Sequence, residues 1–187
     1  VIFFCSRIWW WPYYATTAAG SARDLPAPGD DGLDRSGRRS VILRGFTLTL
    51  APRTMDSRVA QDWLAELART ANTRDYAAHM NQISKRVNVF GVPGIEVVSY
   101  ADWAAQCKHE FESGLLKCVA YAGMKVVAMT PGRLMFKTYE TVEATDGTVN
   151  ANGVEIILEK ETDGVWRVVQ ERLLPPEEVA FDRLLDS

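Results

Sequence analysis

Residues 99–129 of this chain read SYADWAAQCKHEFESGLLKCVAYAGMKVVAM, and their hydrophobic period changes at Gly114. Before that glycine, apolar residues recur every four positions on one helix face: Trp103, Cys107 and Phe111. After it, apolar and polar residues alternate, as they do in a strand. Ser99 is a favourable N-cap residue, and glycine is the residue that most often ends a helix. The stretch therefore predicts a helix over 100–113, followed directly by a long strand over 115–129.

Two further helices are predicted upstream. The first begins at a cap on Asp56 or Ser57 and runs to about Thr70. Its apolar residues form one stripe: Val59, Trp63, Leu64 and Leu67. The second begins at a cap on Thr73 and runs to about Ile83. Its apolar residues also share one face: Tyr76, Met80 and Ile83.

The remaining apolar runs predict strands separated by turns. The strands are expected at 87–90, 134–143, 154–160 and 165–173. The Asp-Gly and Asn-Gly pairs at 146–147 and 152–153 predict a long hairpin loop, and a last helix is expected over 177–185. Helices followed by strands are typical of an α+β protein. We expect three N-terminal helices packed on a strongly curved mixed or antiparallel sheet that forms a cone-shaped hollow.

Residues 1–54 differ in composition from the rest of the chain. Residues 1–14 are dense in aromatic side chains, and residues 23–40 are rich in Pro, Gly, Asp and Arg, which predicts a linker. Residues 41–50 are compatible with a short strand. A signal peptide is an alternative, although Arg7 and Pro12 interrupt the apolar run. We divide the chain into an atypical extension over 1–54, either natural or read from upstream sequence, and a domain over 55–187.

The bulk composition excludes several classes of protein. The formal net charge is −3, which gives no electrostatic reason to expect nucleic acid or an anionic membrane as a partner. The three cysteines are an odd number and lie far apart in the sequence, without zinc-site spacing. We therefore predict no metal, no cofactor and a reduced, cytoplasmic setting.

Three stretches carry a resemblance to a known superfamily. They are DYAAHMNQISKRVNVF at 75–90, GIEVVSYADWAAQCKHEF at 94–111 and GVWRVVQER at 164–172. They look like the second helix and first strand, the turn into the third helix, and the last strand of the nuclear transport factor 2-like superfamily. That superfamily has a cystatin-like cone fold and includes polyketide-cyclase-like (SnoaL-like) proteins and ketosteroid isomerases. The resemblance covers about residues 56–174 and implies the fold.

The resemblance does not imply one reaction, because the superfamily includes enzymes, non-catalytic carriers and oligomerisation modules. A ketosteroid-isomerase-like site needs a carboxylate base, a tyrosine and a protonated aspartate. No aspartate of the predicted strands matches that pattern. The histidines that follow Trp in the last strand of many cyclase-like members are replaced here by Gln170 and Arg172. Whether the protein is an enzyme stays open.

Two residues are candidates for catalysis. If the face of the strand that carries Glu140 lines the hollow, burial would raise the pKa of this carboxyl group, which suits a general base. The structural alternative is a carboxylate paired with Arg172 or Lys137 on a solvated face. His79 lies one turn from Tyr76 and could reach the hollow as a general base. Its alternative is a histidine that packs at the rim of the helix.

The ligand-binding candidates form two groups. The first consists of residues on faces expected to line the hollow: Tyr76, Trp103, Phe136 and Thr138. The second consists of Gln170 and Arg172, which by alternation share a face with Val168 and could bind a carboxylate or carbonyl group. A structural pair between Arg172 and Glu140 is the alternative. Tyr121 and Tyr139 are expected to point either into the hollow or into a dimer interface.

These features support three hypotheses. The preferred one is a homodimer with a small apolar ligand pocket. The dimer would form through the outer sheet face, which carries apolar residues: Tyr139, Ile157 and Val169. The alternatives are a non-catalytic dimerisation or protein-interaction module, and a cyclase- or isomerase-like enzyme that acts on a small hydrophobic substrate.

Overall fold

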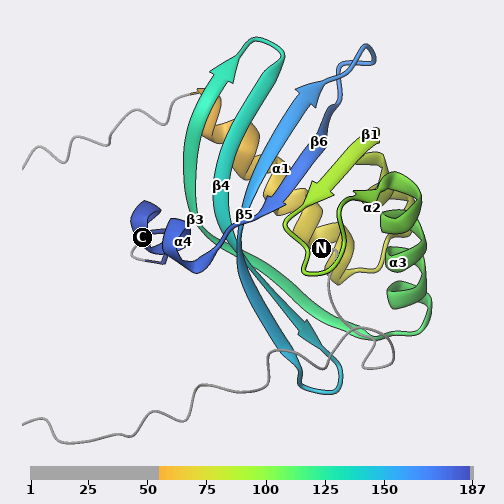
Figure 1. The fold of residues 1–187 in the computed structure, drawn as a ribbon. Coiled ribbons are helices and arrows are strands. Elements are labelled where there is room, and N and C mark those ends of the chain that lie inside the picture. Colours follow the sequence, from red (N-terminus) through yellow and green to blue (C-terminus); the bar gives the residue numbers. More distant parts are fainter. Residues whose placement is uncertain (1–54, 186–187) are drawn as a thin grey trace, which may run out of the picture. The chain divides into compact units, whose positions relative to one another are not determined.

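The computed structural model describes residues 55–185, so the extension predicted over 1–54 lies outside the described residues. Figure 1 shows the elements in chain order. They are α1 (Met55–Asn72), α2 (Tyr76–Asn81), β1 (Ile83–Phe90), β2 (Val98–Ser99), α3 (Tyr100–Glu112), β3 (Leu116–Thr130), β4 (Arg133–Ala144), β5 (Val149–Lys160), β6 (Trp166–Leu173) and α4 (Pro176–Asp182). The class is α+β, as the sequence predicts.

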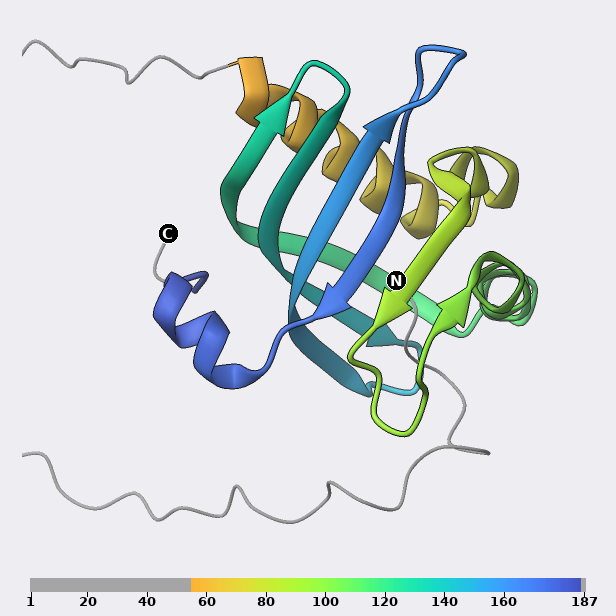
Figure 2. The same cartoon turned by 45° about the horizontal axis from the view of Figure 1, so that its top comes forward.

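The six strands form one mixed sheet in the order β2-β1-β6-β5-β4-β3. Strand β1 runs parallel to β6, and the other neighbours are antiparallel. Figures 1 and 2 show that β3, β4 and β5 bend strongly near their middles. The prediction of three N-terminal helices on a strongly curved mixed sheet is therefore confirmed.

The main core lies between the sheet and the first three helices. Its large buried side chains come from α1, α3 and the inner face of the sheet: Trp63, Leu67, Trp103, Phe111, Phe136 and Ile156. Trp63 meets Phe136 edge to face, with the ring centroids 6.3 Å apart. A separate small cluster joins the C-terminal segment to the outer face of the sheet: Leu174, Val179, Leu184 and Tyr139. Helix α4 thus lies on the opposite side of the sheet from the other helices.

Helix α3 begins and ends where its capping residues predict. The Ser99 hydroxyl accepts a hydrogen bond from the backbone N–H of Asp102, and the Asp102 carboxylate accepts one from the N–H of Ser99 at 2.9 Å. This capping box satisfies two N–H groups that a helix start would leave unpaired. After the helix, Gly114 adopts φ +65°, a conformation that glycine adopts at little cost.

Helix α2 is shorter than predicted. Its N-cap is Asp75 rather than Thr73, because the Asp75 carboxylate accepts a hydrogen bond from the N–H of Ala78. It ends at Asn81, and Ile83 already pairs with Val168 of β6. The helical spacing of Ile83 is overridden because a sheet position satisfies its backbone while its side chain joins the same core.

The loop between β4 and β5 is also shorter than predicted. The turn occupies only residues 145–148, and Asn152 and Gly153 lie inside β5. Gly153 is there because α4 packs against it. A Cβ atom at this position would come within 2.3 Å of the side chain of Val179. An Asn-Gly pair usually signals a turn. At 152–153 it lies inside a strand instead, where the glycine allows a close contact between helix and strand.

Within residues 55–185, no helix is long and apolar enough to cross a membrane. The longest, α1, has 18 residues and is amphipathic. Its charged side chains are exposed: Arg58, Asp62, Glu66 and Arg69. Its opposite stripe is buried in the core, as expected for a helix that covers one face of a sheet.

Candidate functional site

Alternate residues of β4 point to the inner side of the sheet. The buried members of this row are Leu134, Phe136, Thr138, Glu140, Val142 and Ala144. The alternation predicted for this strand is therefore confirmed. Glu140 is the one carboxylic acid in the row, and only 7% of it is exposed. A buried carboxyl group requires hydrogen-bond or charge partners, or a proton.

Tyr121 of β3 supplies a hydrogen bond to Glu140. The two residues are paired in the β3–β4 register, and the Tyr121 hydroxyl donates to Oε1 of Glu140 at 2.8 Å. Burial raises the pKa of the Tyr121 phenol well above its usual value, and the charge of Glu140 raises it further. The phenol therefore keeps its proton and serves as a fixed donor. Because Tyr121 is half-buried, the pair lies near the edge of the core.

A second carboxylic acid, Glu171 of β6, is also on the inner side. A one-residue bulge places it there. Val168 pairs with Leu158 and Gln170 pairs with Ile157, so Val169 is an extra residue in β6. An extra residue moves every following side chain to the opposite face. Glu171 consequently pairs with Ile156 and is only 2% exposed.

The environment of Glu171 favours its protonated form. Burial raises the pKa of this carboxyl group to about 7, and the nearby charge of Glu140 adds to the rise. Among residues 55–185, no side chain donates a hydrogen bond to it. Near neutral pH, Glu171 can therefore either give or accept a proton, while Tyr121 and Glu140 remain joined by their hydrogen bond.

The bulge also overturns the predicted positions of Gln170 and Arg172. Both residues lie on the outer face, so the prediction that they share a face with Val168 is wrong. Arg172 donates to Glu155 of β5 and, through two nitrogens at 3.0 and 2.9 Å, to Glu178 of α4. The alternative pair between Arg172 and Glu140 is not formed either. Arg172 holds the C-terminal helix on the sheet.

His79 is enclosed between the helices. None of its surface is exposed, and its ring meets Phe111 edge to face at 5.4 Å. Its Nδ1 lies 3.0 Å from the hydroxyl of Thr70, which itself donates to the carbonyl of Glu66. Nδ1 is therefore the donor, and Nε2 is an unprotonated acceptor. Burial lowers the pKa of His79 to about 3, so the ring is neutral across the physiological range.

The other predicted ligand-binding residues have structural contacts. Thr138 is fully buried and donates to the carbonyl of Ala122 at 2.8 Å. Tyr76 donates to the carbonyl of Ala104, which ties α2 to α3. Trp103 and Phe136 are fully buried in the core. The structure thus gathers Phe136, Thr138 and Glu140 on one inner row but places Gln170 and Arg172 elsewhere.

Helix α3 contributes a thiol and another acid to the inner side. Burial raises the pKa of the Cys107 thiol to about 12, and the charges of Glu110 and Glu171 add to the rise. Such a thiol is no nucleophile at neutral pH. Glu110 is buried and accepts a hydrogen bond from Gln106 at 2.6 Å. Within residues 55–185, no group of three or more His, Cys, Asp and Glu side chains could hold a metal ion.

Sequence reasoning identified Glu140, left Tyr121 with two possible directions and missed Glu171. Simple alternation from Trp166 places Glu171 on the outer face. The sequence offers one signal, which is an acid inside the run of strand residues WRVVQERL. A solvated strand face would also carry an acid, so this signal does not decide on which face Glu171 lies. The pairing register between β5 and β6 decides that Glu171 lies on the inner face.

Comparison with known proteins supports the fold. No family model matches the sequence, and no curated protein matches it. Solved structures do match. An NTF2-like protein from Cytophaga hutchinsonii is 15% identical, with a TM-score of 0.52 over 62% of this chain and 94% of that one. A protein of unknown function with a cystatin-like fold from Nostoc punctiforme is 10% identical, with a TM-score of 0.51 over 66% and 93%.

A candidate scytalone dehydratase from Novosphingobium aromaticivorans matches in the same way. It is 6% identical, with a TM-score of 0.52 over 62% of this chain and 80% of that one. At identities this low, the similarity shows the fold alone, and any chemistry has to be argued from the residues of the site. The domain over residues 55–185 has the cystatin-like fold of nuclear transport factor 2-like proteins.

Proposed function

We propose that the domain binds a small, largely apolar molecule on the inner side of its sheet and transfers a proton to or from it. The observation that carries this proposal is the hydrogen bond of Tyr121 to Glu140, with a second buried acid, Glu171, whose pKa is raised by the charge of Glu140. Two carboxyl groups in different environments are the arrangement that separates an acid from a base.

The three residues have different roles in this proposal. Glu140 accepts the hydrogen bond of Tyr121 as a carboxylate and acts as the general base. Tyr121 positions that carboxylate. Glu171, protonated in part of the molecules at neutral pH, donates to an oxygen of the ligand on which negative charge develops. A small carbonyl compound with an acidic C–H bond has both of the groups that such a pair requires.

The surroundings favour this chemistry over a purely structural role. The sheet register places Glu140 between Tyr121 and Asn152 and pairs Glu171 with Ile156. Further buried apolar residues belong to the same core: Val119, Val142 and Val154. An apolar setting strengthens hydrogen bonds and charge interactions. A structural role alone would favour neutral side chains at these positions, because buried acids cost free energy.

The test is hydrogen–deuterium exchange at the carbon next to a carbonyl group, followed by proton NMR in heavy water. A panel of cyclic ketones and aryl ketones serves as probes. We expect the full chain to accelerate exchange in at least one probe. Glu140→Gln removes the base and should reduce the rate by about 100-fold or more. Tyr121→Phe should reduce it less, because the base remains.

Lys108→Met is the matched control, since Lys108 is exposed on α3 and its ion pair among residues 55–185 is with Glu112. Its exchange rate should equal that of the unmodified chain. Equal rates for the chain and its Glu140→Gln variant with every probe would contradict the catalytic proposal. If the probes shift amide signals of the protein saturably but their C–H groups do not exchange faster, the domain binds these molecules without catalysing proton transfer.

We also propose that the protein is a homodimer through the outer side of the sheet. Helix α4 lies on that side and covers Tyr139, and Ile157 is buried. The apolar surface left for a partner is therefore at the C-terminal segment and β3: Phe181 is 84% exposed, and Leu185 and Val127 are exposed as well. Native mass spectrometry of the chain and of Phe181→Asp tests this. A dimer that the substitution converts to monomer supports it, and a monomer in both contradicts it.

A further inference from the structure

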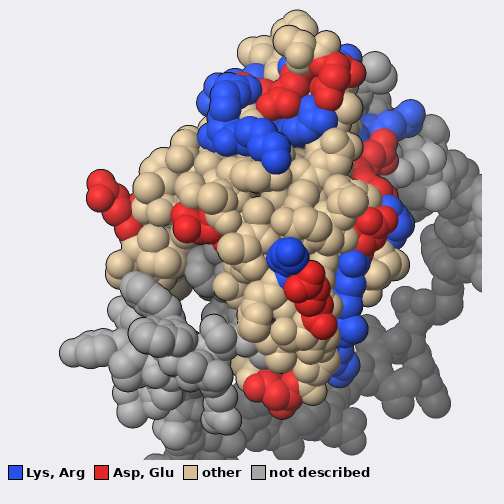
Figure 3. Space-filling view, turned by 90° about the vertical axis from the view of Figure 1, so that its right-hand side faces the viewer, with Lys and Arg blue, Asp and Glu red and all other residues tan. Residues whose placement is uncertain are grey.

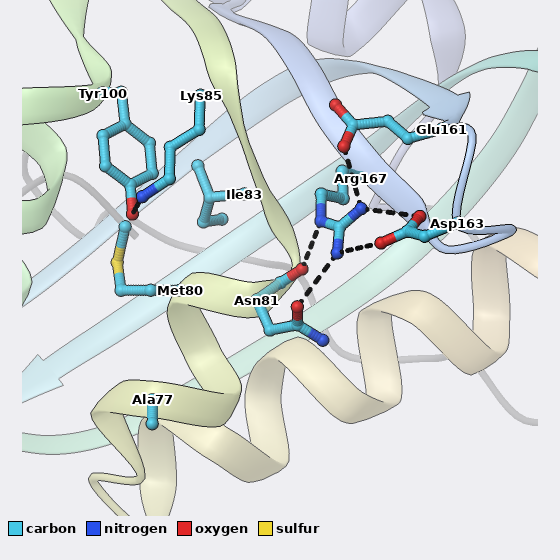
Figure 4. A pocket seen from close by; sticks show the side chains of 9 residues that line it. All are labelled: Ala77, Met80, Asn81, Ile83, Lys85, Tyr100, Glu161, Asp163 and Arg167. Carbon is cyan, nitrogen blue, oxygen red and sulfur yellow. Dashed lines mark hydrogen bonds and ion pairs between the residues drawn. The ribbon is translucent and has the colours of Figure 1, made fainter.

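A pocket lies outside the core, at the end of the sheet where β1 starts and β5 turns into β6. It has a volume of about 430 Å³, within the range of small-molecule sites. Figure 3 faces the right-hand side of Figure 1 and shows Lys and Arg side chains, with Asp and Glu side chains among them, at the top of that face. Figure 4 shows the pocket, with Met80 and Ile83 as apolar lining and Lys85 and Arg167 as its cations.

Arg167 is a fixed wall of this pocket. Its Nε donates to the backbone carbonyl of Asn81 at 2.8 Å, and its Nη2 donates to the side-chain oxygen of Asn81 at 3.0 Å. The two terminal nitrogens also pair with Glu161 and Asp163, each at 2.8 Å. Figure 4 shows these bonds converging on the guanidinium group. All the donors of Arg167 are therefore occupied. Arg86 also lies 3.6 Å from Glu161, and Arg86 and Arg133 both pair with Glu159, so three arginines balance three carboxylates in this network.

The acidic groups of the pocket are occupied as well. Glu161 accepts from Arg167 through one oxygen and from the Ser84 hydroxyl through the other, at 2.8 Å. Asp163 accepts from Arg167 and from the backbone N–H of Val165. The hydrogen bonds and the Arg167 charge both lower the pKa of these two carboxyl groups, so both stay ionised. Each is thus already paired with a cation of the protein.

Lys85 is the cation that remains. It is exposed, and its Nζ lies 3.8 Å from the centre of the Tyr100 ring and donates to the Tyr100 hydroxyl. Within residues 55–185, no carboxylate lies within ion-pair distance of it. The side-chain NH₂ of Asn81 likewise donates to no described residue. The polar groups left in the pocket are thus donors around one positive charge.

We infer that this pocket binds a small organic monoanion, a carboxylate with an apolar body. The carboxylate accepts hydrogen bonds from Lys85 and the Tyr100 hydroxyl, and the apolar body lies against Met80 and Ile83. One uncompensated cation matches a single negative charge, whereas a phosphate dianion would leave one charge unpaired. This site is separate from the inner acids Glu140 and Glu171, so it does not rest on the proton-transfer proposal.

The test is fluorine NMR of 4-fluorobenzoate titrated with the full chain. We expect saturable broadening and a shift of the fluorine signal. The neutral analogue 4-fluorobenzamide has the same shape and should bind about tenfold more weakly or worse. Lys85→Met removes the charge while keeping most of the length of the side chain, and should weaken benzoate binding by about tenfold or more. Lys108→Met, on the exposed face of α3, should bind as the unmodified chain does.

Two further variants separate the possible explanations. Tyr100→Phe keeps the ring and removes the hydroxyl, and it should weaken binding less than Lys85→Met does. Glu112→Gln, on the exposed face of α3, should leave binding unchanged. Equal affinity of benzoate and benzamide, equal affinity of the Lys85→Met variant and the unmodified chain, or no binding at about 10 mM probe would overturn the inference.

Discussion

Gly153 of β5 lies directly beneath Val179 of α4, and there is no room between them for a side chain. A Cβ atom on residue 153 would come within 2.3 Å of Cγ2 of Val179 and 3.3 Å of Cβ of Leu174. Real Cβ atoms essentially never make contacts as short as the first. The close approach of the helix to the strand thus depends on the hydrogen atom of this glycine.

We predict that Gly153→Ala destabilises the domain by about 1–3 kcal/mol, the usual cost of forcing a methyl group into packed space. Urea unfolding followed by circular dichroism measures the change. Gly132→Ala is the control, because a Cβ atom at position 132 has no neighbour within 4 Å. Its stability should stay within about 0.5 kcal/mol of the unmodified chain. An unaffected Gly153→Ala variant would show that α4 does not pack here in solution.

The ion pair between Arg172 and Glu178 should hold α4 in place. Hydrogen bonds from Arg172 lower the pKa of Glu178 to about 2, and Lys137 contributes as well. Because the pKa in the folded state is lower than in the unfolded chain, the stabilisation is present above pH 4.5 and is lost as pH falls towards 2. We expect Glu178→Gln to speed amide hydrogen exchange in residues 176–184 at neutral pH.

The matched control for that experiment is Glu177→Gln, since Glu177 is exposed in the same helical turn. Mass spectrometry of peptic fragments reports the exchange. The difference between the two variants should shrink as the pH approaches 2, where Glu178 itself becomes protonated. Equal exchange in both variants at neutral pH would mean that apolar contacts alone dock the helix.

The burial of His79 predicts a contribution to acid unfolding. Its pKa is about 3 in the folded state and 6.5 as the reference value, so the unfolded chain binds the proton more tightly. Stability therefore falls as the pH drops from 6.5 towards 3, with a slope of at most about 1.4 kcal/mol per pH unit from this one group. His79→Leu should flatten the pH dependence of the free energy of unfolding in that interval.

Removing the imidazole also breaks its contact with Thr70, so the variant should be less stable near neutral pH. That offset does not change the comparison of slopes. His109→Gln, at the exposed position on α3, should keep the slope of the unmodified chain. If the slopes of the His79→Leu variant and the unmodified chain agree, His79 is protonated without opening of the core.

Glu171 predicts the opposite pH dependence. Its pKa is about 7 in the folded state and 4.5 as the reference value, so folding favours the protonated carboxyl group. The contribution is fully present below 4.5 and is lost as the pH rises through 7. Glu171→Gln stays neutral at every pH. The variant should therefore gain stability relative to the unmodified chain between about pH 5 and about pH 8.

Urea unfolding at the two pH values gives the comparison. Glu96→Gln, at an exposed position of the 91–97 connection, controls for the general effect of removing a negative charge. A constant difference between the Glu171→Gln variant and the unmodified chain at both pH values would place an ionised Glu171 in the folded protein. The acid role proposed for this residue would then fail.

Local sequence accounts for the elements whose signals are local. The capping box of Ser99 and Asp102 and the four-residue repeat of Trp103 and Cys107 specify α3 without help from the rest of the chain. The alternation around Glu140 likewise places that acid on the same face as Phe136 and Thr138. These predictions are correct because they depend only on hydrogen bonds and side-chain periodicity within one segment.

The sequence by itself therefore determined the α+β class, the order of most elements and the set of β4 residues that share a face with Glu140. Only the tertiary structure decided that Glu171 joins Tyr121 and Glu140 on the inner side, while Arg172 lies outside. The reason is the extra residue Val169, because a bulge becomes visible only when two strands pair. A one-residue shift moves every later side chain of the strand to the opposite face. The residue pattern of one strand does not show where its pairing with the next strand shifts.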